Sequence, residues 1–153
     1  MALLSPSDQE KLREAFAEMR HSVKILFFTQ TLGCETCPQT RQIIDELPPL
    51  SDKITVDEVN LVLDPEKAKR YGVARAPALA LLHGGNGTDA EAAGSFNDSR
   101  IRFMGTPAGY EFMSLINAVL LVGGRASSLT EGNRKKIAAI DKPLTVQVFT
   151  TPT

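Results

Sequence analysis

The chain contains only two cysteines, Cys34 and Cys37, and two residues separate them. This spacing suits thiol–disulfide exchange, metal binding or a structural disulfide. A structural zinc ion needs four ligands, whereas the chain has no second cysteine pair, and neither of its two histidines has a metal-ligand spacing to the cysteines. A metal or iron–sulfur cluster shared between two chains and a local structural disulfide remain as alternatives, although so short a loop stabilises little. The spacing therefore favours a redox-active disulfide, with no metal and no other cofactor.

The cysteine motif lies between an apolar stretch of strand length, residues 23–29, and a stretch with helical spacing, residues 39–47. The start of a helix gathers free backbone N–H groups and the positive end of the helix dipole, which favour a thiolate. Cysteines in this setting have pKa values of roughly 3.5–7.5, against about 8.5 for a free cysteine. We therefore expect Cys34 to be the attacking sulfur. Cys37, one helical turn further on, is expected to be more buried and to resolve the mixed disulfide.

Three neighbours of the cysteines are predicted to tune this chemistry. Pro38 suits the first turn of a helix, where no N–H hydrogen bond is lost. The carboxylate of Glu35 should raise the pKa of Cys34, whereas the hydroxyl of Thr36 can donate a hydrogen bond to the thiolate and lower it. Because these effects have opposite signs, the sequence predicts tuning by Glu35 and Thr36 without fixing the direction of the net shift.

A second signal lies at Pro77, which precedes the apolar run of residues 78–82. Proline cannot donate a hydrogen bond to a sheet, so it is expected at the start of this strand. A trans bond before proline is the common form, but the position after a strand–cysteine motif–helix unit favours a cis bond. A cis bond would place the backbone groups of Ala76 beside the cysteines, where an extended substrate can pair with them. Ala76 and Pro77 are therefore predicted to bind substrate.

The rest of the chain alternates between helical and strand patterns. The start of the first helix has two possible caps, Ser5 followed by proline or Ser7 with Glu10, and a later helix is predicted to have Thr106 as its N-cap and Pro107 as its first residue. A long connection is expected over residues 83–100. The predicted elements are a helix over residues 6–20, strands over 23–29, 54–61, 78–82 and 101–104, helices over 39–47, 65–71, 107–123 and 128–140, and a strand over 144–150.

Composition indicates one core and an extension. The chain has 153 residues, 42% hydrophobic and 23% charged residues and a net charge of −1, which argues against nucleic-acid or membrane-surface partners. It has neither a signal-peptide core nor an apolar run of about 20 residues, so we expect a cytoplasmic protein. The pattern predicts an α/β domain over residues 1–124, with a mixed four-stranded sheet flanked by helices, and a further helix and strand over residues 125–153.

Four stretches of the chain carry a resemblance to a known family. Residues 5–19, the strand leading into 34–37, residues 75–78 and above all 105–112 (GTPAGYEF) resemble the N-terminal unit of the glutaredoxin-like protein disulfide oxidoreductases, in the thioredoxin superfamily. The resemblance implies a thioredoxin-like fold, exchange of disulfides with protein substrates through the cysteine pair, and an upstream reductase. The N-terminal module of alkyl hydroperoxide reductase flavoproteins is similar, which implies electron relay as an alternative. A redox-inert interaction module is the alternative from another class.

The C-terminal residues repeat the opening of the chain at an offset of 121 residues, which matches Ser7 with Ser128 and Phe28 with Phe149. Adding the offset to Cys34 gives position 155, since 34 + 121 = 155, two residues past Thr153. Residues 125–153 are therefore interpreted as the start of a second, truncated unit. A strand without its own sheet has unpaired backbone groups, so we expect residues 144–150 to pair with a sheet edge, in the same chain or in a second copy to form a homodimer.

Overall fold

The computed structural model describes residues 3–85 and 95–149, and these form a sheet with helices on both faces. The sheet has the strand order β2-β1-β3-β4, with β1 parallel to β2 and antiparallel to β3, and with β3 antiparallel to β4. The predicted mixed four-stranded sheet is therefore confirmed. The elements are α1 (Pro6–Ala17), β1 (Val23–Thr29), α2 (Cys37–Asp45), a 3-10 turn (Pro48–Leu50), β2 (Ile54–Asn60), α3 (Pro65–Arg70), β3 (Ala78–Gly84), β4 (Phe96–Met104), α4 (Tyr110–Val122) and α5 (Glu131–Ala138).

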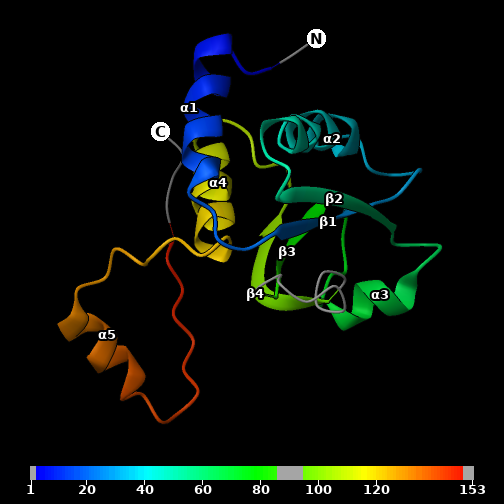
Figure 1. The fold of residues 1–153 in the computed structure, drawn as a ribbon. Helices are drawn as coiled ribbons and strands as arrows, with labels where there is room; N and C mark the ends of the chain where they lie inside the picture. The colour runs from blue at the N-terminus through cyan, green and yellow to red at the C-terminus, as the bar shows by residue number, and fades with distance from the viewer. Residues whose placement is uncertain (1–2, 86–94, 150–153) are drawn as a thin grey trace.

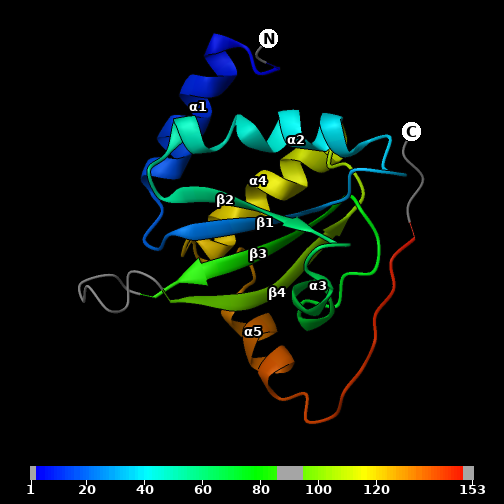
Figure 2. The same cartoon turned by 90° about the vertical axis from the view of Figure 1, so that its right-hand side faces the viewer.

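The two faces of the sheet carry separate cores. Successive side chains of a strand point to opposite faces, so Ile25 and Phe27 of β1 join one core while Leu26 and Phe28 join the other. The first core contains residues of α1, α2 and α4, and the second contains Ala68 of α3. Figures 1 and 2 show this arrangement, with α3 on the side of the sheet opposite α2 and α4. Burial on both faces explains why β1 is apolar throughout.

The first helix begins at Pro6, and its N-cap is Ser5 rather than Ser7. The hydroxyl of Ser5 accepts a hydrogen bond from the backbone N–H of Asp8, at 3.2 Å. The proline at the first helical position loses no hydrogen bond there. The helix ends at Ala17, earlier than predicted, and packs Leu12 and Phe16 into the first core.

The start of α4 differs from the prediction, because its N-cap is Gly109 and not Thr106. The backbone N–H of Ala108 donates to the carbonyl of Thr106 at 2.9 Å, so Pro107 lies in a turn before the helix. Gly109 has a φ of 59°, which glycine adopts readily, and the helix follows it. The hydroxyl of Thr106 is used elsewhere, in a hydrogen bond to Thr40.

β4 is longer than the strand predicted over residues 101–104, since it begins at Phe96. It is an edge strand, and its pairing with β3 is irregular between Ala80 and Leu82. In this bulge Arg100 has a φ of 64°, and the Asp98 carboxylate accepts hydrogen bonds from the Arg100 backbone N–H and the Arg102 guanidinium. The tip of the expected connection, residues 86–94, lies outside the described residues.

The bulge predicts a pH-dependent contribution of Asp98 to stability. Hydrogen bonds from Arg102 lower the pKa of Asp98, while partial burial opposes them. A lowered carboxylate pKa contributes stability above the unfolded value of about 3.9, and this contribution is lost as the pH falls through the folded value. Because the pair is partly exposed, Asp98→Asn should cost less than about 1 kcal/mol at neutral pH. Urea unfolding should show this difference disappearing in acid; a difference that persists there would contradict the proposed cause.

The C-terminal segment contradicts the prediction of a strand paired within its own chain. α5 forms within the predicted range, capped by Thr130, but residues 142–149 form no strand. Figures 1 and 2 show α5 and the following chain apart from the sheet and its helices. The segment is extended without a neighbouring edge to supply hydrogen bonds, and a strand needs that partner. Its apolar side chains are exposed, namely Leu144, Val146, Val148 and Phe149. No helix among residues 3–85 and 95–149 is both long and apolar enough to cross a membrane.

Candidate functional site

The two cysteines form a disulfide in the turn between β1 and α2, with a Cα–Cα distance of 5.4 Å that is ordinary for a disulfide. Cys37 is the first residue of α2. It belongs to the first core and is 5% exposed, whereas Cys34 lies at the margin of that core and is half-buried. The structure therefore confirms that Cys37 is the more buried sulfur. Cys34 is the one that a large partner can approach.

The three residues predicted to tune the cysteines lie around the start of α2. Thr36 is the N-cap of the helix, but its hydroxyl makes no capping hydrogen bond. Pro38 follows in the first turn of the helix, as predicted. Both Glu35 and Thr36 are exposed. Their positions are compatible with tuning of Cys34, which remains a prediction.

Pro77 lies directly before β3, and its bond with Ala76 is cis, as the sequence predicted. Pro77 is buried and Ala76 is half-buried. Ala76 and Cys34 both pack against the core cluster that contains Cys37. The carbonyl of Pro77 accepts a hydrogen bond from the backbone N–H of Gly105, at 2.9 Å. The structure thus brings the proline segment and the cysteine motif to the same core.

Sequence reasoning did not assign two threonines to this site: Thr40 was not singled out, and Thr106 was predicted only as a helix N-cap. Thr40 is completely buried in α2, and its hydroxyl lies 2.7 Å from the hydroxyl of Thr106, in the turn before α4. Thr40 follows Cys37 by three residues and precedes Ile44 by four, so it lies on the apolar face of the helix. A polar residue at an apolar-face position was the available signal. Its partner, 66 residues away in sequence, could not be identified from that signal.

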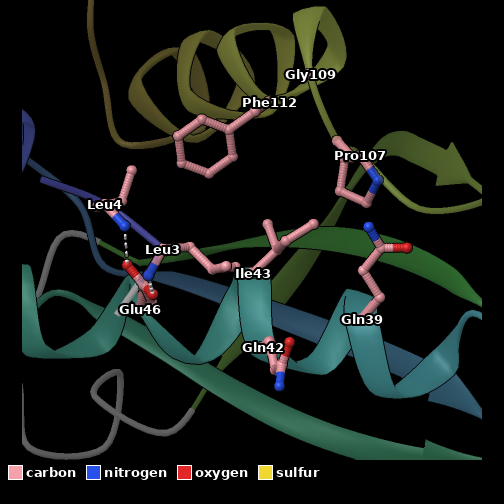
Figure 3. Close-up of a pocket in the computed structure, with 10 residues that line it drawn as sticks. Leu3, Leu4, Gln39, Gln42, Ile43, Glu46, Pro107, Gly109 and Phe112 are labelled. Carbon is pink, nitrogen blue, oxygen red and sulfur yellow. Dashed lines mark hydrogen bonds between the residues drawn. The ribbon is translucent and has the colours of Figure 1, made fainter. Parts of the chain in front are cut away.

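A groove runs along α2 from the end that bears the cysteines. Its volume is about 370 Å³, and residues of α2, of the turn before α4 and of the N-terminal segment line it. Figure 3 shows Gln39 and Pro107 at one end and Glu46 at the other, with Ile43 and Phe112 between them. The Glu46 carboxylate accepts hydrogen bonds from the backbone N–H groups of Leu3 and Leu4, which hold the N-terminal segment there. The groove is therefore mainly apolar and begins two residues after Cys37.

No three histidine, cysteine, aspartate or glutamate side chains in residues 3–85 and 95–149 are placed to hold an ion.

Curated relatives share sequence with the chain, and two of them illustrate the similarity. A probable thioredoxin of Methanothermobacter thermautotrophicus is 32% identical over 96 residues, which cover 62% of this chain and 93% of the relative. The thioredoxin of Methanocaldococcus jannaschii is 30% identical over 60 residues, covering 39% of this chain and 69% of the relative. No family model matches the chain.

Solved structures extend the similarity beyond the thioredoxin-sized region. The NTD_N/C domain of the alkylhydroperoxide reductase AhpF of Enterococcus faecalis superposes with a TM-score of 0.75 and 29% identity, over 91% of this chain and 62% of that chain. This chain therefore spans less than two thirds of that domain. A protein disulfide oxidoreductase of Aeropyrum pernix has a TM-score of 0.69 at 23% identity, over 88% of this chain and 54% of that chain, and so shares the fold.

The comparisons agree with the geometry of the site. A cysteine pair joined in a disulfide lies at the start of α2, a cis-proline precedes β3, and the chain superposes on its structural neighbours over most of its length. The first relative is matched over nearly its whole length. The chain therefore belongs to the thioredoxin family.

Proposed function

We propose that the protein is a thiol–disulfide oxidoreductase that exchanges disulfides with protein substrates through Cys34 and Cys37. One observation carries the proposal: the two sulfurs are close enough to form a disulfide, and the half-buried one precedes the start of α2 while the buried one opens it. The helix start favours a thiolate at Cys34. Ala76, which packs against the same core cluster as Cys34, and the adjoining Pro77 are proposed to bind the substrate backbone.

The reaction begins with the reduced pair. The Cys34 thiolate attacks one sulfur of the substrate disulfide, whose S–S bond breaks, and the departing sulfur leaves as a thiolate that takes up a proton. The Cys37 thiol loses its proton and attacks Cys34. This breaks the mixed disulfide and releases the second substrate thiolate, which is also protonated. The substrate gains two electrons and the pair becomes oxidised. An upstream dithiol reductase must return two electrons to restore the pair.

The surface around Cys34 supports a polypeptide as substrate. Leu32, two residues before Cys34, is 85% exposed, and the apolar groove along α2 begins two residues after Cys37. Apolar surface at both sides of the motif can contact the side chains that flank a substrate cysteine. A chain with two cysteines in a redox pair also suits the cytoplasm, where disulfides are mostly catalytic. We therefore propose protein disulfides as substrates and the cytoplasm as the location.

Insulin-disulfide reduction tests the proposal. Thiols are counted before and after dithiothreitol, and precipitation of the insulin B chain is followed with dithiothreitol as electron donor. Catalysis well above the rate with dithiothreitol alone is expected. A rate equal to that background would reject the protein-disulfide proposal. A redox titration against glutathione then sets the direction: a potential more oxidising than about −150 mV would favour an oxidase over the proposed reductase or isomerase.

An electron relay is the second candidate function. It is favoured by the 29% identity to the alkylhydroperoxide reductase domain over 91% of this chain. In this proposal the pair accepts electrons from a flavoprotein and passes them to one partner protein, rather than to many substrates. Residues 105–112 also support placement with the glutaredoxin-like protein disulfide oxidoreductases. The two candidate functions differ in the range of proteins that they reduce. A general oxidoreductase reduces many protein disulfides, whereas a relay reduces its one partner much faster than insulin.

The exposed C-terminal segment supports a homodimer as a further proposal. Leu144, Val146 and Val148 are exposed at alternate positions, and no residue of α5 is buried. β2 and β4 are the outer strands of the sheet. Pairing of the segment with an outer strand of a second copy would cover both.

Sedimentation tests this dimer. The full chain should sediment as a dimer at micromolar concentration, and a chain ending at Gly124, which keeps both cores, should be a monomer. Amide exchange over residues 144–149 should be slow in the full chain. A monomeric full chain with fast exchange in this segment would exclude the pairing.

A further inference from the structure

Two threonine hydroxyls connect the turn before α4 to the cysteine motif. The Thr40 hydroxyl is 3.0 Å from the carbonyl oxygen of Thr36, the residue before Cys37, and 2.7 Å from the hydroxyl of Thr106. Thr36 is the N-cap of α2 and Thr40 lies within the helix, whereas Thr106 follows β4. A contact between a buried hydroxyl and an element 66 residues away is more than the local bond that a helical threonine makes to its own helix.

The donors in this chain of hydrogen bonds are fixed by chemistry. The carbonyl of Thr36 can only accept, so Thr40 uses its single hydroxyl hydrogen to donate to it. Thr106 must therefore donate to the oxygen of Thr40. The Thr36 carbonyl also accepts from the backbone N–H of Thr40, at 3.0 Å. Thr40 thus donates two hydrogen bonds to this carbonyl, one from its backbone N–H and one from its hydroxyl. The hydrogen bond from Thr106 fixes the direction of the hydroxyl.

Holding the Thr36 carbonyl also holds the N–H of Cys37. The two groups belong to one planar trans peptide and point in opposite directions. The Cys37 N–H points back at Cys34, whose carbonyl it meets at 3.4 Å. Its acceptor in the oxidised protein is thus the backbone carbonyl of Cys34, the residue whose sulfur becomes a thiolate on reduction. A fixed N–H stabilises that negative charge better than one that is free to turn away.

The same turn holds the substrate-binding segment. The backbone N–H of Gly105, the residue before Thr106, donates to the carbonyl of Pro77 at 2.9 Å. Gly105 thus contacts Pro77, and the adjacent Thr106 contacts Thr40, which in turn holds the peptide between Thr36 and Cys37.

We propose that Thr40, oriented by Thr106, is a positioning residue that holds the Cys37 N–H toward Cys34 and thereby sets the stability of the thiolate and the reduction potential of the pair. The proposal deepens the proposed function and rests on it. Loss of the Thr40 hydroxyl should raise the pKa of Cys34 and destabilise the reduced form. The disulfide is then more stable relative to the dithiol, so the variant should be more reducing. A pair whose reduced form is stabilised is, conversely, more oxidising.

Thr40→Val tests the proposal, because valine keeps the shape of threonine and removes the hydroxyl. Full-length protein is equilibrated with reduced and oxidised glutathione, and the Cys34 pKa is followed by the ultraviolet absorbance of the thiolate. The equilibrium constant should shift about three- to tenfold toward the oxidised protein, the effect of one lost hydrogen bond. A tenfold shift corresponds to about 30 mV. The Cys34 pKa should rise in parallel.

Three further variants separate positioning from packing. Thr40→Ser keeps the hydroxyl and should remain within twofold of the wild type. Thr106→Val should shift the equilibrium in the same direction as Thr40→Val, and it decides the question if Thr40→Val does not fold. Thr29→Val is the matched control, since Thr29 is also buried, at 8% exposed, and takes no part in the hydrogen bonds that link Thr36, Thr40 and Thr106. It should leave the equilibrium unchanged.

An unshifted equilibrium in Thr40→Val, or a shift of equal size in Thr40→Ser or Thr29→Val, would overturn the proposal. The glutathione equilibrium and the Cys34 pKa do not depend on a protein substrate. A chain that fails to reduce insulin can therefore still pass this test, and an active chain can fail it, so the two proposals are rejected by different results.

Discussion

Replacing Cys34 by serine is expected to abolish insulin reduction, with the rate above background falling by more than about 10³-fold. A serine hydroxyl is not ionised at neutral pH, and serine cannot form the mixed disulfide through which exchange proceeds. Cys37 cannot take over, because it is buried in the first core at 5% exposed. The measurement is the initial rate of B-chain precipitation with dithiothreitol as donor, for wild type and variant at equal concentration.

The fold of the variant is its control. Cys34 is half-buried at the edge of the core, and the disulfide closes a very short loop. Loss of this bond should therefore cost little stability. Circular dichroism and the urea midpoint of the reduced wild type and of Cys34→Ser should agree closely. Equal insulin turnover by the two folded proteins would reject the enzyme and favour the redox-inert interaction module.

The central strands could be predicted because their signal is local. β1 has the predicted bounds, since a strand covered on both faces is apolar along its whole length and stands out from its flanks. β4 could be only partly predicted. It is an edge strand with a bulge, where the Asp98 carboxylate accepts hydrogen bonds from the Arg100 backbone N–H and the Arg102 guanidinium. These charged residues interrupt the apolar alternation on which the strand prediction relied.

The C-terminal segment shows the opposite failure. Leu144, Val146 and Val148 follow the alternation of a strand, and the sequence predicted one over residues 144–150. A pattern specifies which side chains share a face, but a strand forms only when another edge supplies hydrogen bonds. No strand edge in the described part of the chain does so for residues 144–149. The pattern correctly identified the alternating apolar side chains, but the prediction of a strand paired within the same chain was wrong.

The site was predictable where one residue type permits few roles. Two cysteines at this spacing and a proline before an apolar run each have a short list of uses, so Cys34, Cys37 and Pro77 could be named. Thr40 and Thr106 could not, because threonine has many uses and their bond exists only after α2 and the turn before α4 have packed together. The prediction of Thr106 as an N-cap failed for the same reason: a tertiary partner took the hydroxyl that a local rule assigned to the helix.

Replacing Cys37 by serine should convert the protein from a catalyst into a trap. Cys34 remains free to attack a substrate disulfide, but the thiol that lies within disulfide distance of it is gone. Resolution must then wait for a second thiol from solution. Because an intramolecular attack is far faster than a bimolecular one at ordinary thiol concentrations, the mixed disulfide should accumulate on most of the chains. In the wild type it should be almost undetectable.

The trap is measured with the reduced variant and an excess of insulin, without dithiothreitol. After acid quenching and alkylation, intact mass spectrometry should show the chain plus one insulin chain, and added dithiothreitol should release both. Cys34→Ser, treated in the same way, is the matched control and should capture nothing, because Cys37 is buried. Capture by Cys34→Ser and not by Cys37→Ser would reverse the two roles. Applied to a cell extract, the same variant would also separate the two candidate functions: an oxidoreductase with many substrates should capture many proteins, whereas a relay should capture one or two.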